Sequence, residues 1–265
     1  MDEYISKETW QQLSAGEKQK IVEAVARVRR ERENGETPKV SLPKSLYVRY
    51  GKRILDIMIS GAALLVTLPI NAGILVITYF DVGKPILFRQ ERVGRNEKTF
   101  FLCKFRNMTN ATNERGELLP PSERVTKWGQ FVRKTSLDEL LNFWSILKGD
   151  MSVIGPRPMP IKYLERFSAR HRQRHLVRPG LECPFHEERL ASEGWQGRFE
   201  NDIWYVENIS FGTDLRMAWL LVKKVFSRAE RSESASGSTG EFIGYGPDGN
   251  AMDENTIPAE YLKEL

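Results

Sequence analysis

The sequence predicts a helix-rich α+β protein, held on one face of a membrane by a re-entrant helix-break-helix and carrying a cytosolic domain. Three observations favour this fold class. Residues 54–80 form a long apolar segment, yet Pro69 and Asn71 lie near its middle. Basic residues precede and follow this segment, so both of its ends favour the cytoplasmic side. The stretch that comes next alternates apolar and polar residues, as short strands do.

The composition indicates one main core with appendages, because 40% of the 265 residues are hydrophobic. The sequence has only two cysteines, Cys103 and Cys183, and no cleavable signal pattern. Both observations predict a reducing, cytoplasmic setting. The formal charge of +5 is unevenly divided, because residues 230–265 hold eight acids and two bases. The strongly basic remainder favours a partner that carries phosphate, such as an anionic membrane, a phosphorylated ligand or a nucleic acid.

Residues 1–45 are expected to form an amphipathic helix and a connector. The helix is predicted over residues 14–32, where Ser14 and Glu17 have the spacing of a capping box. One face of this helix is apolar and holds Ile21, Val25 and Val28. Gly and Pro within residues 33–45 predict the connector.

Residues 46–82 are predicted to enter the membrane and return to the same face. The leg before Pro69 would rise only about 22 Å, against a hydrocarbon core of roughly 30 Å. Proline removes an amide donor and disfavours helical geometry at Leu68, so a bend there would return the second leg. Thr67 or Asn71 could satisfy the freed carbonyls. A single tilted span and a buried soluble helix are the alternatives.

Residues 83–226 are predicted to form the main domain, which begins with short strands and turns. Cations are interleaved through its first part and continue to Arg133, shortly before two adjacent carboxylates. Residues 227–265 are expected to be a polar linker (227–240) followed by an acidic C-terminal tail.

The two carboxylates, Asp138 and Glu139, stand at the head of an apolar helix. A structural interpretation is a capping box between Ser136 and Glu139, with Asp138 favouring the positive end of the helix dipole. A chemical interpretation is a phosphate site, because arginines so close to two carboxylates can hold a phosphate beside them. Taken alone, these residues leave both interpretations open.

Six segments of the membrane helix and the main domain together carry a family resemblance: KRILDI, FRQERVG, KFRNM, SLDELLN, LKGDMSVIGPRP and VRPG. Their order and spacing resemble those of bacterial sugar transferases, the monotopic phosphoglycosyl transferases that begin glycan assembly on polyprenyl phosphate. The resemblance extends over about residues 48–226. It implies a re-entrant membrane helix and an active site on the cytoplasmic face of the bacterial inner membrane.

The resemblance also implies a reaction. A sugar phosphate would pass from a nucleotide sugar, usually a UDP-sugar, to undecaprenyl phosphate, with release of UMP. Asp138 would be the nucleophile, forming a covalent aspartyl-phosphosugar intermediate that splits one difficult transfer into two steps. Glu139 would belong to a magnesium site. A diphosphate repels a carboxylate nucleophile, so Mg²⁺ and fixed cations would be needed before attack.

Position within the motifs implies further contacts with the substrate. These contacts are Lys104, Arg133, Pro156, Arg157 and Pro158. The two prolines would restrict the backbone around the arginine and lower the entropic cost of holding it. Asp150 is an additional candidate that could organise a neighbouring cation.

The chain departs from the family pattern in three places. Leu68 stands where a serine usually precedes the membrane-bend proline, so a hydroxyl that could satisfy a freed carbonyl is lost. Asn142 stands where a glutamine is common. Residues 179–198, PGLECPFHEERLASEGWQGR, replace the family's usual pattern, so the identity of the sugar cannot be carried over.

Two alternatives come from other classes of protein. An inactive membrane scaffold would not need the acidic pair and its cations, which are intact. A nucleic-acid-binding protein would use the arginine-rich stretch 166–178, but no recognised motif accompanies it and no nucleic-acid partner is expected. His171 and His175 favour a basic helical face near phosphates over a metal pair, and Cys183 and His186 form an isolated C-x-x-H. The oligomeric state stays open, a homodimer included.

Overall fold

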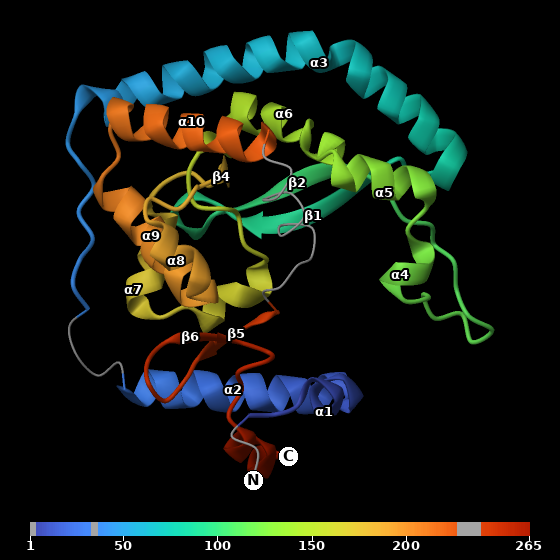
Figure 1. Cartoon of the computed structure of the whole chain (residues 1–265), viewed down its shortest axis with the longest axis vertical. Coiled ribbons are helices and arrows are strands. Elements are labelled where there is room, and N and C mark those ends of the chain that lie inside the picture. Colours follow the sequence, from blue (N-terminus) through green and yellow to red (C-terminus); the bar gives the residue numbers. More distant parts are fainter. Residues whose placement is uncertain (1–3, 33–36, 227–239) are drawn as a thin grey trace.

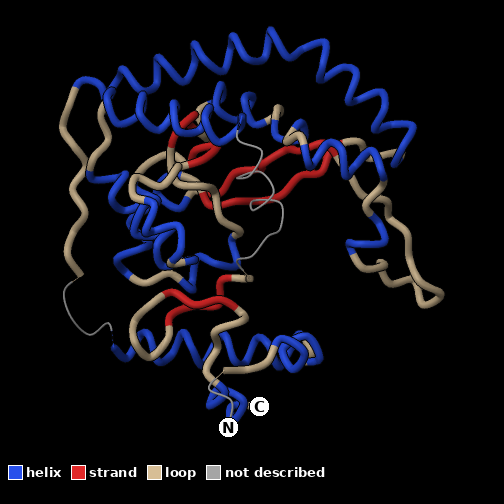
Figure 2. The backbone as a smooth tube through the Cα atoms, viewed as in Figure 1, coloured by secondary structure: helices blue, strands red, loops and turns tan. Residues whose placement is uncertain are grey.

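The computed structural model describes residues 4–32, 37–226 and 240–265. One long helix arches over the top, the main domain lies beneath it, and a smaller layer built from both ends of the chain closes the bottom (Figure 1). Helices predominate, with short strands set between them (Figure 2). The prediction of a helix-rich α+β fold with one long apolar helix is confirmed.

The arching helix is α3 (Lys52–Val82), and a π-helical turn at Tyr47–Gly51 leads into it. Among the described residues, this is the one helix long and apolar enough to cross a membrane. Pro69 lies inside α3, which bends but continues (Figure 1). The Thr67 hydroxyl donates to a carbonyl one turn earlier (2.7 Å) and accepts from the Asn71 amide (3.1 Å).

The prediction that the helix is interrupted at Pro69 is therefore wrong, because α3 bends but continues through this residue. A proline removes only one backbone hydrogen bond, and a bend is the usual response of a long helix to that loss. The Thr67 hydroxyl bonds to a backbone carbonyl of the same helix and the Asn71 amide nitrogen bonds to Thr67, so both donors find partners without interrupting the helix.

The start of α3 is fastened to the main domain. Arg53 donates to the carbonyls of Ile146 (2.6 Å) and Leu147 (2.7 Å), which end a helix of that domain. Asp56 is buried, and its carboxylate accepts from Ser152 Oγ (2.9 Å). The charged side chains near the start of α3 therefore form contacts with the main domain instead of facing the solvent or the membrane.

The end of α3 is fastened to the same domain. Asp81 accepts from Thr126 Oγ1 (2.6 Å), and the Trp128 indole donates to the hydroxyl of Thr78 (3.2 Å). Between the two attachments, large apolar side chains are exposed, among them Leu65 at 76%. The helix therefore forms an arch whose two ends contact the main domain and whose middle part exposes apolar side chains.

The strands of the main domain form two small sheets. β1 (Leu87–Val93) and β2 (Thr99–Phe105) are antiparallel and joined through a 3-10 turn at Arg95–Glu97, which confirms the predicted short strands. β3 (Ser152–Ile154) and β4 (Gly180–Glu182) are parallel. The buried face of β2 packs with the helix before β3, through Phe100, Leu102, Ile146 and Met151.

Helices surround these sheets. They are α4 (Pro121–Arg124), α5 (Lys127–Lys134), α6 (Asn142–Lys148), α7 (Ala169–Arg172), α8 (Glu188–Ser192), α9 (Gly194–Glu207) and α10 (Phe211–Phe226). Three 3-10 turns complete the domain: η3 (Leu137–Glu139), η4 (Ile161–Arg166) and η5 (Gln173–Leu176). α10 runs beneath α3, on the side of the domain that faces the arch (Figure 1).

The bottom layer joins the two ends of the chain. Its elements are α1 (Lys7–Gln12), α2 (Ala15–Arg32), β5 (Phe242–Tyr245), β6 (Ala251–Asp253) and the 3-10 turn η6 (Ala259–Glu264). The predicted capping box of α2 is confirmed, because the Glu17 carboxylate accepts from Ser14 N (2.8 Å) and Glu17 N donates to Ser14 Oγ (3.3 Å).

The prediction of residues 227–265 as a linker and acidic tail is corrected for its last part. Residues 240–265 fold against α2, because apolar side chains between the acids, such as Ile243 and Ile257, are fully buried there. Apart from Gly240, the predicted linker 227–240 lies outside the described residues.

Candidate active site

The turn between α5 and α6 presents Asp138 and Glu139. α5 ends at Lys134, and the chain reverses through Ser136, whose φ of 56° and ψ of 22° lie in the left-handed region. The 3-10 turn η3 follows directly. A non-glycine residue held in this conformation is strained, and such strain is concentrated at functional sites.

The predicted capping box between Ser136 and Glu139 is wrong. The Ser136 side chain makes no capping hydrogen bond. The Glu139 carboxylate instead accepts from Lys104 Nζ (2.7 Å) and from Arg157 Nη2 (2.9 Å), both on Oε1. Two bonds from cationic donors to an ionised carboxylate are stronger than one bond from an uncharged backbone amide, which explains the choice. Glu139 thus joins β2 to the loop after β3.

The two neighbouring carboxylates have opposite pKa shifts. Burial raises the pKa of Asp138, which is 8% exposed; Lys104 opposes this rise and the charge of Glu139 adds to it. Burial also acts on Glu139, but the charges of Arg157 and Lys104 outweigh it and lower the pKa. Arg133 is exposed on the last turn of α5 and adds a smaller lowering effect on Asp138.

The loop Pro156–Pro158 is fixed through its three consecutive carbonyls. The first accepts from Gly180 N (3.0 Å), the second, that of Arg157, accepts from Arg174 Nη2 (3.0 Å), and the third accepts from Arg92 Nη1 (3.2 Å). Proline restricts φ and has no amide to compete for acceptors. The backbone around Arg157 is therefore held from three sides, beyond the restriction predicted from the prolines.

Two glycines allow this loop to leave the parallel sheet. A Cβ on Gly180 would lie 2.2 Å from Gly155 N, and a Cβ on Gly155 would lie 2.7 Å from the Arg178 carbonyl. No other residue fits where the two backbones approach so closely. This contact explains the glycines of the VIGPRP and VRPG segments.

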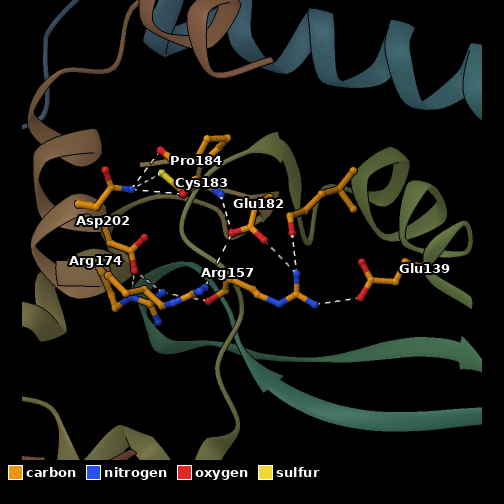
Figure 3. A network of polar contacts seen from close by, with 10 residues as sticks. Glu139, Arg157, Arg174, Glu182, Cys183, Pro184 and Asp202 are labelled. Carbon is orange, nitrogen blue, oxygen red and sulfur yellow. Dashed lines mark hydrogen bonds and ion pairs between the residues drawn. The ribbon is translucent and has the colours of Figure 1, made fainter. Parts of the chain in front are cut away.

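Arg157 connects the acidic turn to a buried ion pair (Figure 3). Its guanidinium contacts Glu139 on one side and Glu182 (3.4 Å) on the other. Its carbonyl is held by Arg174, whose Nε and Nη2 contact one Asp202 oxygen at 2.9 and 2.5 Å. Arg174 and Asp202 are 1% and 2% exposed. A continuous row of polar contacts thus leads from the interior to Glu139.

Sequence reasoning missed Arg174, Asp202 and Glu182 as members of this site. Arg174 stood in a stretch interpreted as a surface, and Glu182 stood in the segment that departs from the family pattern. The available signal was Asp202, an acid beside the apolar run Ile203–Val206 of α9. A carboxylate buried beside apolar residues needs a cation as its partner, but the sequence does not show which cation that is.

The arginine-rich stretch 166–178 is largely neutralised by carboxylates of the protein itself. The ion pairs are Arg166–Glu241, Arg170–Glu200, Arg172–Glu97 and Arg174–Asp202. The predicted basic helical face is therefore corrected in its charge, because each of these guanidinium groups is paired with a carboxylate; its place near phosphates stays a prediction. The electrostatic footprint on which the nucleic-acid alternative depended is accordingly much reduced.

His171, His175 and Cys183, which the sequence offered as weak metal-ligand candidates, are buried inside the protein. His171 is buried between the hydroxyl of Tyr245 and the carboxylate of Glu200, each at 2.8 Å. Burial lowers the pKa of His175 to about 3. Cys183 is buried, and burial raises the pKa of its thiol. Within the described ranges, no group of three His, Cys, Asp or Glu side chains could hold a metal ion.

Asp150 and Asn142 lie near the acidic turn in sequence, with different surroundings. Asp150 pairs with Lys148 (2.6 Å) and lines an open hollow of about 310 Å³ between β2 and α6, whose lining includes neither Asp138 nor Glu139. Asn142 is 4% exposed, and its Oδ1 has no hydrogen-bond partner among the described residues.

The donor set fits a hard cation that shares its ligands with a substrate. Magnesium prefers oxygen and often keeps only one or two protein carboxylates beside substrate phosphates and water. Glu139 meets this requirement as an ionised carboxylate, since its pKa is lowered. Together with the fixed cations Lys104 and Arg157, this arrangement has the charges that a diphosphate next to the Asp138 carboxylate would require.

Comparison with known proteins identifies the family. The family model described as "Bacterial sugar transferase" matches residues 47–228. EpsL, an uncharacterised sugar transferase of Bacillus subtilis (strain 168), is 38% identical over 174 residues, which cover 66% of this chain and 86% of that protein.

Two further relatives have activities in their names. A UDP-glucose:undecaprenyl-phosphate glucose-1-phosphate transferase of Klebsiella pneumoniae is 35% identical over 66% of this chain and 40% of that protein. A UDP-N-acetylgalactosamine-undecaprenyl-phosphate N-acetylgalactosaminephosphotransferase of Aeromonas hydrophila is 29% identical over 70% and 46%, respectively. The chain spans less than half the length of these two relatives. The matched region contains the whole acidic turn and its cations, and the chain belongs to the bacterial sugar transferase family.

Proposed function

We propose that this protein transfers a sugar-1-phosphate from a UDP-sugar to undecaprenyl phosphate and releases UMP. The single observation that carries the proposal is the buried carboxylate of Asp138 beside Glu139, which Lys104 and Arg157 hold at 2.7 and 2.9 Å. The names of the Klebsiella and Aeromonas relatives support this reaction class. The relatives named for a sugar differ in that sugar (glucose, galactose or N-acetylgalactosamine), so no sugar is assigned.

Asp138 is the proposed nucleophile. Its carboxylate oxygen attacks the sugar-proximal phosphorus, a new oxygen–phosphorus bond forms, and the bond to the bridging oxygen breaks, so that UMP leaves with that oxygen. An oxygen of undecaprenyl phosphate then attacks the same phosphorus and displaces the Asp138 carboxylate. The lipid ends with a diphosphate-linked sugar, and the enzyme returns to its first state.

The cations around the acidic turn offset the charge of the diphosphate. Lys104 and Arg157 lie on the Glu139 side of the turn and Arg133 on the α5 side, so negative charge between them is stabilised from two directions. The fixed loop Pro156–Pro158 presents Arg157 in one orientation and lowers the entropy that binding must remove. Magnesium held through Glu139 would supply a further positive charge at the phosphates.

The same proposal includes a monotopic, re-entrant attachment to the cytoplasmic face of the inner membrane. Both ends of α3 contact the main domain, so a helix that crossed the bilayer would draw a polar domain in with it. α10 adds an exposed apolar stripe on the side of the arch, spaced as one helical face: Phe211, Leu215, Trp219 and Val222. Such a stripe suits the membrane interface.

The covalent step is tested by intact-mass measurement. The purified protein is incubated with magnesium and a panel of UDP-sugars, without undecaprenyl phosphate. With the correct donor, we expect release of at most one UMP per protein and addition of one phosphosugar to the chain. Asp138→Asn keeps the size of the side chain but removes its charge, so both signals should vanish.

The outcomes separate three mechanisms. Direct transfer would give turnover with both substrates together, but neither an adduct nor a UMP burst with the donor alone. An inactive scaffold would release no UMP under any condition, including the complete mixture. Glu114→Gln is the control, because it removes an exposed acid from the loop before α4 and should leave the burst unchanged.

A further inference from the structure

The bottom layer touches the main domain at one concentrated place. Phe242 of β5 is fully buried and packs against Phe199 (4.9 Å between ring centroids), Phe167 (5.5 Å) and Tyr163 (5.5 Å). Its backbone carbonyl accepts from the Arg166 guanidinium. None of β5 belongs to the region matched by the family model, so this contact is an addition to the family domain.

Polar contacts surround that aromatic cluster and fix its orientation. The Trp195 indole donates to the Gly240 carbonyl (2.9 Å), and Ala251 N donates to the Gln196 side chain (2.9 Å). Glu241 accepts from Arg166 (2.8 Å) and from Lys162. Trp195 and Gln196 lie in the segment that departs from the family pattern, so the C-terminal strands hold the part of the domain that is peculiar to this chain.

Two rings of the same cluster also contact a residue of the active-site network. The guanidinium of Arg174 lies over the rings of Phe167 and Phe199, 5.5 Å from each centroid. Arg174 is the residue that donates to the Arg157 carbonyl. A path of direct contacts therefore leads from Phe242 through two aromatic rings and one guanidinium to Arg157.

We propose that β5 is a positioning element of the active site, in which Phe242 holds Phe167 and Phe199 so that Arg174 keeps Arg157 beside Glu139. The inference rests on the proposed function for its kinetic consequence. Phe242 and Arg174 touch no substrate, and they act through the orientation of Arg157. The folded C-terminal strands are thus part of the catalytic unit and distinguish this chain from the family domain alone.

Neighbouring residues of β5 offer a matched pair of variants. Phe242→Leu keeps an apolar side chain but removes the ring that meets the main domain. Ile243→Val alters the next residue, which is equally buried but packs toward α2 in the bottom layer. We expect Phe242→Leu to raise KM for the UDP-sugar about tenfold or more, as when one charged contact is misplaced, and Ile243→Val to leave it unchanged.

A second test separates positioning from simple stability. Arg174→Met combined with Asp202→Leu removes both members of the buried ion pair, so no unpaired charge is left and folding is retained. The Arg157 carbonyl nevertheless loses its donor. The inference predicts a melting temperature near that of the natural protein together with a raised KM for the UDP-sugar. Recovery of the natural KM along with the melting temperature would overturn it.

Hydrogen exchange gives a readout that does not depend on activity. Gly155 N donates to the Glu182 carbonyl (3.3 Å) and Gly180 N to the Pro156 carbonyl (3.0 Å), so both amides report on the Arg157 loop. Phe242→Leu should speed their exchange, and Ile243→Val should not. Equal behaviour of the two variants, in exchange and in KM, would refute the inference. A natural protein without UMP release would refute only the proposed function, and exchange would still decide this one.

Discussion

Glu139→Gln tests whether Glu139 acts mainly as an ion-pair acceptor or as a structural cap. The contacts of Glu139 set the expected losses of stability and of activity. Glutamine keeps the length and one acceptor oxygen of Glu139 but loses its charge. The side chain faces Lys104 and Arg157, and these three side chains are 27%, 24% and 40% exposed. The two cations can therefore regain water when the charge is lost.

The expected loss of stability is small. Lys104 and Arg157 stay charged, so their hydrogen bonds to glutamine remain charge-assisted and only the attraction between opposite charges is lost. For two partly exposed ion pairs this loss is up to about 2 kcal/mol, or up to roughly 8 °C in melting temperature for a chain of this size. Thermal unfolding in detergent, followed by tryptophan fluorescence, measures it.

The expected loss of activity is much larger. Arg157 and Lys104 lose the group that orients them, and the carboxylate suited to magnesium is gone, so UMP release should fall at least about 100-fold. Glu182→Gln is the matched control, because it removes the same charge beside Arg157 at a longer distance of 3.4 Å. Near-normal UMP release by Glu139→Gln would refute this reasoning, and so would an equal loss in both variants.

Three more predictions follow from the contacts of single residues. Ser136→Gly should be neutral or stabilise the protein by up to about 1 kcal/mol in thermal unfolding, because glycine adopts φ 56° without strain; a capping serine would instead give a loss. His171, aided by Arg170, lowers the pKa of Glu200 from 4.5 to about 2, so its stabilising effect is present above pH 4.5 and lost as the pH falls toward 2. Melting temperatures between pH 5 and 3 should therefore fall more steeply in the natural protein than in Glu200→Gln. In a Cys103→Ser background, cysteines at Ser45 and Glu114 should both be labelled from the cytoplasmic side only, and opposite-side labelling would contradict the re-entrant attachment.

Local rules predicted the local features of this fold. The α2 cap, the antiparallel pair β1–β2 and the long apolar helix were all readable, because each depends on residues close in sequence. Pro69 was overinterpreted, since one missing hydrogen bond bends a long helix without ending it. The C-terminal segment was predicted to be a tail because most of its charged residues are acidic. That prediction overlooked Phe242 and Ile243, whose burial folds the segment against the rest of the protein.

The sequence indicated which residues to consider for the site, but not how their side chains are arranged. The family resemblance implied Asp138, Glu139, Lys104 and Arg157 as site residues, and the structure brings the last three into contact, with Asp138 next to Glu139. Spacing could not choose between a cap and an ion pair at Glu139, because that choice depends on cations 35 and 18 residues away in the chain. For the same reason, the buried Arg174–Asp202 pair was out of reach of sequence reasoning.

The environments of the two adjacent carboxylates favour different roles for them. Burial acts to raise the pKa of Glu139, but the charges of Arg157 and Lys104 outweigh it and lower the pKa, so this carboxylate is an anion held by two cations. Burial raises the pKa of Asp138, so its ionised form is the stronger base of the two and the better suited to the nucleophilic role proposed for it. Pairs of acids whose surroundings separate their pKa values commonly divide such roles. In the proposed reaction, the cations that hold Glu139 would also face the charge of the diphosphate, and Asp138 would be the carboxylate that attacks phosphorus.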